Sequence, residues 1–179
     1  MSVTVVFETH ALSDDNERGV ASGWNHSGLS ERGRALAAEL GDRRRDDGIV
    51  AVFASDLRRA VETVEIAFAS SLVPVYLDWR LRECNYGERN GAPSADHGST
   101  RRRFIDTPYP GGESWRQATN RVDGAIDDIC ARYDGARILV VGHVATRWAL
   151  EQRTGGKSLE QLATEDFAWQ EGWEFVFSR

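Results

Sequence analysis

The chain has 179 residues, of which 41% are hydrophobic and 28% charged, and its formal net charge is −6. This length suits one sizeable core, so we expect a single domain over residues 1–179. The acidic excess disfavours general binding to nucleic acid or to anionic membranes, although it still allows a local basic pocket.

The first ten residues, MSVTVVFETH, carry no basic leader. Their apolar run of about five residues is too short for a signal peptide or a membrane span. We therefore expect a cytoplasmic protein. The two cysteines, Cys84 and Cys130, share no CxxC or Cys/His spacing. Reduced thiols are expected, with neither a disulfide framework nor a zinc site.

Short β-rich runs alternate along the chain with longer segments of helical period, which is typical of α/β proteins. The expected strands are residues 3–7, 49–54, 72–77, 138–141 and 173–177. Their near-continuous apolar character suits strands that are covered on both faces. We predict a three-layer α/β/α sandwich, with helices on both faces of a mostly parallel central sheet.

The first expected helix begins at Ser30, a good N-cap, and ends at Gly41, a natural stop. Further apolar stripes indicate helices behind Ser55 (Leu57, Val61, Val64 and Phe68), at Trp115, Ala118, Val122, Ile126 and Ile129, and around residues 148–150 before Gly155 and Gly156. Residues 84–112 show little periodicity, so we expect a long excursion over one edge of the sheet. Long loops in compact domains tend to be functional.

Two histidines follow expected strands. His10 lies just past the first strand, and His143 lies just past the apolar run ILVV. In open α/β sheets ligands bind at the carboxyl ends of the strands. We therefore predict that the two imidazoles lie side by side, one as a nucleophile and the other as a hydrogen-bonding partner. Taken alone, either histidine is more often a structural residue.

Arg59 and Glu83 are the other candidate site residues. Arg59 lies where the helix behind Ser55 begins, and a guanidinium there can join free backbone N–H groups in binding an oxyanion. Glu83 follows a strand-like segment and precedes a glycine-containing turn, where a carboxyl near an anion site can act as a general acid. In isolation, each would be an ordinary surface charge.

Taken in order, these residues resemble the histidine phosphatase (phosphoglycerate mutase-like) superfamily over nearly the whole chain. The family's Arg-His-Gly triplet corresponds to Thr9-His10-Ala11. Asn16, Ser22-Gly23-Trp24 and residues 29–33 resemble its phosphate loop and its "G-W…L-T-x-x-G" helix start. Each motif is weak by itself, but the ordered set is specific.

Four later segments extend the resemblance. Residues 55–63 are similar to "S-x-L-x-R-A-x-x-T", residues 81–87 to "L-x-E-x-x-x-G", and residues 110–114 to "P-x-G-E-S". Residues 140–143 resemble the strand that carries the family's second histidine, although Val144 replaces the usual glycine.

The resemblance implies a two-step phosphoryl transfer through a phosphohistidine, without metal or cofactor, on a small phosphorylated metabolite. His10 would attack phosphorus, and Glu83 would protonate the leaving oxygen and later activate water. Arg59 and His143 would hold the equatorial oxygens.

The phosphate pocket would also include Asn16, backbone N–H groups near Gly23, and Thr9. Thr9 stands where the family places an arginine. Losing one preorganised donor commonly lowers the rate by about 10² to 10³. Three interpretations stay open: Arg18 or one of residues 101–103 reaches in, the substrate carries less phosphate charge, or the protein is no longer a competent phosphatase.

The substitution Thr9→Arg separates the effects of a missing cation. It should raise activity on simple phosphomonoesters if the guanidinium is merely absent. It should lower activity if another arginine already fills the space. It should change specificity if the native substrate needs a neutral group at this position.

We predict a metal-independent phosphatase acting on a small phosphomonoester. A phosphoglycerate mutase is disfavoured, because those enzymes usually carry longer insertions and a C-terminal tail. The alternative from another class is a weakly active or inactive member that binds a ligand or regulates. The oligomeric state is undefined, with a homodimer as one candidate. Trp24, Tyr86 and Trp115 could line a substrate pocket, although aromatic residues are more often core.

Overall fold

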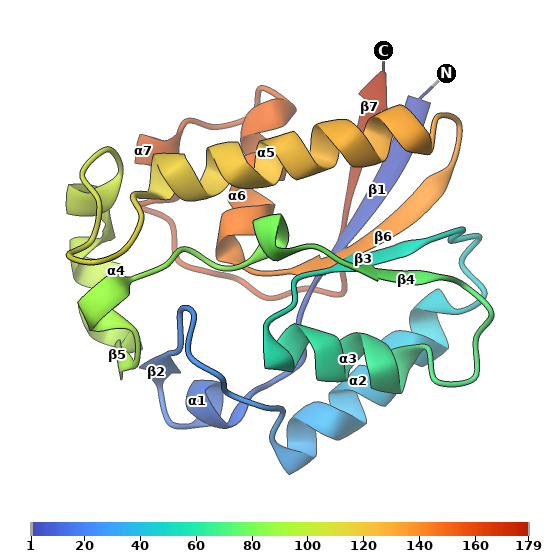
Figure 1. The fold of residues 1–179 in the computed structure, drawn as a ribbon, viewed down its shortest axis with the longest axis horizontal. Coiled ribbons are helices and arrows are strands. Elements are labelled where there is room, and N and C mark those ends of the chain that lie inside the picture. The colour runs from blue at the N-terminus through green and yellow to red at the C-terminus, as the bar shows by residue number, and fades with distance from the viewer. Residues whose placement is uncertain (1, 179) are drawn as a thin grey trace.

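The computed structural model describes residues 2–178 and contains a five-stranded sheet of order β4-β3-β6-β1-β7 (Figure 1). The strands are β1 (Ser2–Thr9), β3 (Val52–Ala54), β4 (Val75–Leu77), β6 (Arg137–Gly142) and β7 (Trp173–Ser178). β7 runs antiparallel to β1, whereas β1, β3, β4 and β6 pair in parallel. The prediction of a mostly parallel sheet is confirmed.

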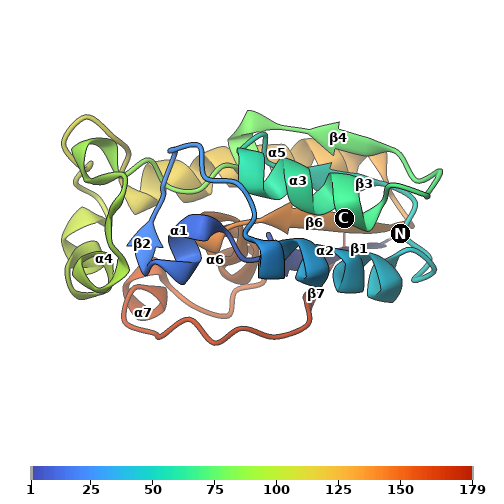
Figure 2. The same cartoon turned by 90° about the horizontal axis from the view of Figure 1, so that it is seen from below.

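Helices cover both faces of this sheet (Figures 1 and 2). One face packs against α2 (Glu31–Arg44) and α3 (Arg58–Ala67), and the other against α5 (Trp115–Arg132) and α6 (Val144–Arg153). Side chains alternate between the faces of a strand. In β6, Leu139 therefore joins the core under α2 and α3, while Val140 joins the core under α5 and α6. This arrangement is the predicted three-layer sandwich.

The excursion over residues 84–112 is more ordered than expected. It contains η2 (Gly87–Arg89), β5 (Ala92–Pro93), α4 (Ser94–Thr100) and η3 (Arg101–Phe104). The helix α4 has the sequence SADHGST, whose small polar residues form no apolar stripe that periodicity could reveal. β5 pairs with β2 (Val20–Ala21), and this ties the excursion to the loop after β1. The remaining short elements are α1 (Asp14–Glu17), η1 (Trp79–Leu81) and α7 (Leu159–Leu162).

Three expected boundaries were wrong. The second and third strands begin at Val52 and Val75, three residues later than predicted in each case. The first helix does not end at Gly41 but continues to Arg44. A Cβ atom at Gly41 would lie 2.3 Å from the carbonyl oxygen of Ala67 in α3, so this glycine permits close packing of two helices rather than a stop.

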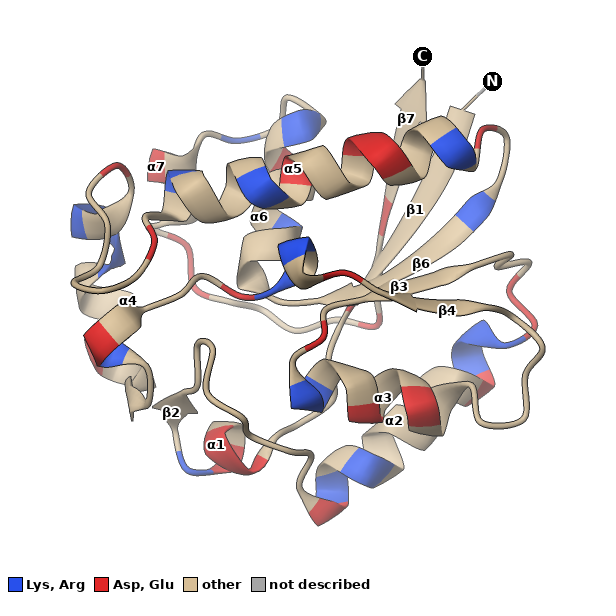
Figure 3. Ribbon diagram, viewed as in Figure 1, with Lys and Arg blue, Asp and Glu red and all other residues tan. Residues whose placement is uncertain are grey.

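Charged residues of both signs are interspersed along α2, α3 and α5 (Figure 3). Within residues 2–178 no helix combines the length and apolar character needed to cross a membrane. Because the charges on these helices do not separate by sign, we identify the arginines of the site from their individual contacts.

Gly33, in the first turn of α2, lies against the backbone that follows β1. A Cβ atom there would be 1.8 Å from the carbonyl oxygen of Leu12. Gly33→Ala should therefore lower the free energy of unfolding by about 2–3 kcal/mol, because the helix must move off this segment. Urea denaturation followed by circular dichroism measures the change.

Gly124→Ala is the matched control, because Gly124 lies on an exposed part of α5 with open space around it. It should stabilise the fold by about 0.5–1 kcal/mol through helix propensity alone. Equal effects of the two substitutions would contradict the proposed role of Gly33.

Candidate active site

The register of two neighbouring strands brings the histidines together. Thr9 of β1 pairs with Gly142 of β6, and the backbone N–H of His10 donates to the carbonyl oxygen of Gly142 at 3.1 Å. His10 and His143 are thus the next residues of two adjacent parallel strands. Their ring centroids lie 5.0 Å apart. This confirms the predicted adjacency at the carboxyl edge of the sheet.

The imidazole of His10 is oriented by the backbone. Its Nδ1 lies 2.7 Å from the carbonyl oxygen of Ala11. A carbonyl oxygen only accepts, so Nδ1 carries the hydrogen and Nε2 carries the lone pair. The N–H of Ala11 donates to Oγ1 of Thr63 at 3.0 Å, which holds this turn against α3. Burial, assisted by the charge of Arg59, lowers the pKa of His10 to about 3. His10 is therefore neutral at physiological pH.

Arg59 is a buried cation, with 3% of its surface exposed. Its guanidinium donates to the carbonyl oxygens of Gly23 at 2.8 Å and Asn25 at 3.4 Å, and to Nε2 of His10 at 3.2 Å. It forms no ion pair with any residue in 2–178, and burial lowers its pKa. A buried charge without an ion-pair partner is destabilising, and only more distant acidic groups, Glu83 foremost, stabilise this one. The surroundings of Arg59 are therefore suited to an anion.

His143 is 2% exposed and is held by Ser55, which follows β3. The hydroxyl of Ser55 lies 2.6 Å from Nε2 of His143, and a guanidinium nitrogen of Arg59 lies 3.4 Å from Nδ1. Burial, followed by the charge of Arg59, lowers the pKa of His143 well below its usual value. A guanidinium only donates, so Nδ1 is the acceptor in its contact with Arg59. Donation from Nδ1 to a phosphate oxygen requires the other tautomer, in which Ser55 donates to Nε2.

Glu83 is 8% exposed and accepts backbone hydrogen bonds. Its Oε1 accepts from Cys84 at 2.8 Å and Ala145 at 3.1 Å, and its Oε2 accepts from Val144 at 3.2 Å. Burial raises the pKa of Glu83, while these N–H groups and Arg59 oppose the rise. A carboxyl group with a raised pKa holds a proton more readily, which suits a general acid. Because Oε2 has the single and longest bond, it is the better position for that proton.

The segment that carries Glu83 is fixed by Arg121 of α5. Arg121 donates to the carbonyl oxygens of Arg80 at 2.6 Å, Arg82 at 3.1 Å and Glu83 at 3.3 Å. It also forms an ion pair with Glu113 at 2.8 Å. Glu113 of the Pro-Gly-Gly-Glu-Ser segment therefore helps to position Glu83 through Arg121. No sequence motif indicated this role.

The loop around Gly23 acts differently from expectation. Gly23 has a φ of +53°, and its carbonyl oxygen accepts from Arg59. The neighbouring N–H of Trp24 donates to Oδ1 of Asn90 at 3.3 Å. A Cβ atom at Gly23 would lie 1.9 Å from that same oxygen. The loop thus orients Arg59 through carbonyl groups, and the binding of phosphate by N–H groups near Gly23 stays a prediction.

Arg18 and Arg101 were candidates to replace the family arginine that is absent at position 9, and both bind other groups. Arg18 forms an ion pair with Asp15. Arg101 donates to the carbonyl oxygens of Ala163 at 3.0 Å and Glu165 at 2.8 Å. Neither Arg18 nor residues 101–103 line the cavity that contains His10, whereas Arg32 and Arg43 of α2 do.

A cavity of about 590 Å³ joins the candidate residues. Its lining includes Thr9, His10, Asn16, Glu83 and His143, and it continues to Leu36 and Leu40 of α2 and to Phe167 and Trp169 before β7. The amide oxygen of Asn16 accepts from the N–H of Ser13 at 3.1 Å, so its N–H₂ group is the donor it can offer to a ligand.

Trp24, Tyr86 and Trp115 do not line this cavity, which agrees with the more common core role of aromatic residues. Tyr86 and Trp115 are 6% and 2% exposed and pack in a third core cluster. The indole N–H of Trp24 donates to the carbonyl oxygen of Glu83 at 2.7 Å. Phe167 and Trp169 carry the aromatic wall instead, and their aperiodic segment gave no signal in the sequence.

Comparison with known proteins agrees with this geometry. The model of the histidine phosphatase superfamily (branch 1) matches residues 5–168. The probable phosphoglycerate mutase GpmB of Erwinia tasmaniensis is 36% identical over 129 residues, which cover 68% of this chain and 60% of that protein. A bifunctional protein of Mycobacterium tuberculosis is 36% identical over 143 residues, covering 75% of this chain and 39% of that protein. The chain therefore spans less than two thirds of these relatives.

Solved structures show the same fold. Bacillus stearothermophilus YhfR has a TM-score of 0.83 at 25% identity, covering 97% of this chain and 90% of that one. A mycobacterial glucosyl-3-phosphoglycerate phosphatase has a TM-score of 0.77 at 21% identity, covering 90% of this chain and 85% of that one. Together with the family match along most of the sequence, these likenesses show that the chain belongs to the histidine phosphatase superfamily.

Proposed function

We propose that this protein is a phosphatase that hydrolyses a small phosphomonoester through a phosphohistidine on His10, without a metal ion. The buried guanidinium of Arg59 carries the proposal. It lies 3.2 Å from the lone-pair nitrogen of His10 and lacks an ion-pair partner among residues 2–178. A phosphate oxygen would supply the missing negative charge and would hold phosphorus beside the nucleophile.

In the first step, Nε2 of His10 attacks phosphorus and the ester P–O bond breaks. The leaving oxygen takes the proton from Oε2 of Glu83, so the alcohol departs neutral. Arg59 and the Nδ1–H of His143 bind the non-bridging oxygens, and the N–H₂ of Asn16 adds a neutral donor. Positioning and charge stabilisation of this kind carry most of phosphoryl-transfer catalysis.

In the second step, water attacks the phosphohistidine and the P–N bond breaks. Glu83, now a carboxylate, takes a proton from that water and returns to its starting form. His10 is released neutral, and inorganic phosphate leaves. Each group is restored, so the cycle needs no co-reactant besides water.

His10→Ala should lower kcat for hydrolysis of an aryl phosphate by about 10⁴ or more, because the covalent route is lost. Addition of EDTA to the wild type should leave the rate unchanged. Release of inorganic phosphate measures both effects.

His26→Ala is the matched control, since His26 is exposed and should tolerate the change. Activity that disappears with EDTA would point to a metal mechanism. If phosphomonoesters bind but none is turned over, the protein is the binding or regulatory member that Thr9 makes conceivable.

The pH dependence should identify Glu83 as the acid. Burial raises the pKa of Glu83, so its protonated form persists to higher pH than in a free carboxyl. We therefore expect kcat/KM to fall as the pH rises through the pKa of Glu83. His10, with a pKa of about 3, should impose no loss of rate as pH falls from 7 to about 4.

The matched comparison is Glu83→Gln, measured over the same pH range on the same substrate. Substrate ionisation is identical in both proteins, so the difference between their profiles isolates Glu83. The variant should be slower by about 10² or more on an alkyl phosphate and should lack the alkaline fall. An unchanged alkaline fall would assign the acid to another group.

Mutase-type transfer is the second candidate, because several relatives carry phosphoglycerate mutase names. The same phosphohistidine would then pass its phosphoryl group to an organic hydroxyl. Incubating labelled phosphoglycerate with the protein distinguishes the two: hydrolysis releases labelled inorganic phosphate, whereas a mutase moves the label between hydroxyl positions.

A further inference from the structure

The cavity at His10 contains charged side chains as well as apolar ones. One face of α2 contributes five residues to its lining: Arg32, Leu36, Glu39, Leu40 and Arg43. Residues three, four or seven apart lie on the same face of a helix, so these side chains face one space. A phosphate ester in this cavity therefore meets two guanidinium groups from α2, and their own partners decide which of the two is available.

Arg43 is already paired. Its guanidinium lies 3.8 Å from the carboxylate of Glu8 and 4.0 Å from that of Glu171. Glu8 also accepts a hydrogen bond from Arg44 at 2.8 Å. These groups balance their charges at the last turn of α2, so Arg43 is held by acidic residues rather than free to bind a ligand.

Arg32 has no hydrogen-bond or ion-pair partner among residues 2–178, and its side chain is exposed. Glu39, the acidic residue on the same face of α2, lies seven residues further along the chain. Seven residues correspond to about 10 Å along a helix axis, so Glu39 does not neutralise Arg32 by direct contact. Arg32 is therefore the cation of this lining that remains available to an anion.

The first turn of α2, which carries Arg32, is fixed to the segment after the proposed nucleophile. The backbone N–H of Ser30 donates to the carbonyl oxygen of Leu12 at 3.1 Å, and Gly33 packs against the same oxygen. Thr9 lines the cavity that Arg32 lines. Because threonine is short and neutral, a guanidinium that reaches in from α2 can take the place of one at position 9.

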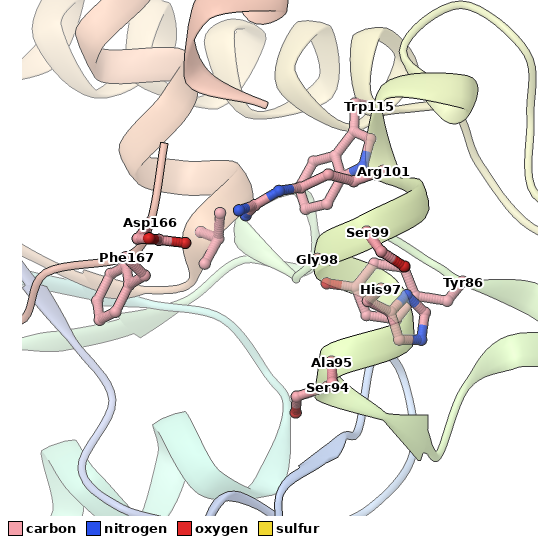
Figure 4. Close-up of a pocket in the computed structure, with 11 residues that line it drawn as sticks. Tyr86, Ser94, Ala95, His97, Gly98, Ser99, Arg101, Trp115, Asp166 and Phe167 are labelled. Atoms are coloured by element: carbon pink, nitrogen blue, oxygen red, sulfur yellow. The ribbon is translucent and has the colours of Figure 1, made fainter. Parts of the chain in front are cut away.

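Arg101 belongs to a different space. It lines a second cavity, of about 500 Å³, between α4 and residues 166–167 (Figure 4). His10 and Glu83 are not among the residues that line this second cavity. Its contacts with backbone carbonyl groups hold Arg101 there. The candidate for a second cation at the phosphate is therefore Arg32.

We propose that Arg32 is the second phosphate-binding cation of this site. Its guanidinium donates to a non-bridging oxygen of the transferred phosphoryl group, in place of the arginine that is absent at position 9. The proposal rests on the phosphatase function proposed above and adds one residue to it. Arg59 offers one positive charge to a phosphate dianion, and a second guanidinium balances the other negative charge.

The contribution of Arg32 should be smaller than that of a preorganised donor, which commonly changes the rate by about 10² to 10³. Arg32 is exposed and is ordered only by the ligand, and this ordering opposes binding. We therefore expect an effect of about tenfold for its removal.

Arg32→Gln should lower kcat/KM by about tenfold for both phenyl phosphate and 3-phosphoglycerate, because the phosphoryl group is common to the two substrates. Arg32→Lys keeps the charge but not the planar pair of donors, so it should recover part of the loss. The thermal unfolding temperature should not change, since Arg32 has no partner to lose among residues 2–178. A loss confined to 3-phosphoglycerate would overturn the proposal, because Arg32 would then bind the carboxylate of the leaving group.

Arg34→Gln is the matched control. It removes the same charge from the same helix, but Arg34 pairs with Glu62 at 3.3 Å and does not line the cavity. The kinetics of this variant should equal those of the wild type. An equal loss in the two variants would reduce the effect to net charge and would contradict the assignment of Arg32.

Thr9→Arg gives an independent test, because its effect should depend on Arg32. In the wild type the added guanidinium would crowd and repel Arg32, so kcat/KM should not rise. In Arg32→Gln the same substitution should restore about tenfold, since the space is then open. A rise of equal size in both backgrounds would show that Arg32 does not occupy this place.

Inorganic phosphate, titrated by calorimetry into the wild type and the variants, separates failure of this inference from failure of the function. Phosphate binding that weakens about tenfold in Arg32→Gln, without turnover of any ester, would refute the phosphatase and uphold the role of Arg32. Turnover with unchanged kinetics in Arg32→Gln would refute the role of Arg32 and uphold the phosphatase. Absence of both turnover and phosphate binding in the wild type would refute both.

Discussion

The parallel pairing of β1 with β6 determines where the two histidines of the site lie. Thr9 is opposite Gly142, so the residues that follow them leave the sheet at the same level. The neighbouring pair of β3 with β6 brings Ser55 to that level too, because Ala54 lies opposite Val141. A one-residue slip in either pairing would turn side chains to the opposite face of the sheet. The buried apolar residues on both faces hold this register, so the core and the site depend on the same alternation.

Burial shifts the pKa values of the histidines and of Glu83 in opposite directions, and both shifts favour phosphoryl transfer. It lowers the pKa of both histidines and raises that of Glu83, so the nucleophile is neutral and the acid retains its proton more readily. The charge of Arg59 strengthens the first effect and opposes the second. Because these groups share one low-dielectric site, removing Arg59 would change their protonation as well as phosphate binding.

Motif order predicted the adjacency of His10 and His143, since strand ends can be located from apolar runs. The same reasoning could not assign Ser55 or Arg121, whose roles depend on contacts between elements far apart in the chain. Gly41 was misread because close packing against α3 and a helix stop both require glycine. Phe167 and Trp169 gave no periodic signal, because an irregular segment places side chains by its contacts rather than by a repeat.

Arg59 is the arginine within hydrogen-bond distance of His10, so catalysis without an arginine at position 9 needs binding energy from other contacts with the substrate. With both histidines neutral, Arg59 carries the positive charge beside the nucleophile, and Arg32 and Arg43 line the same cavity. A charge-assisted hydrogen bond contributes about 1.5–3 kcal/mol, and each buried methylene contributes about 0.8 kcal/mol. An alcohol that buries a few carbon atoms against Leu36 and Trp169 can therefore match the contribution of the arginine that Thr9 replaces.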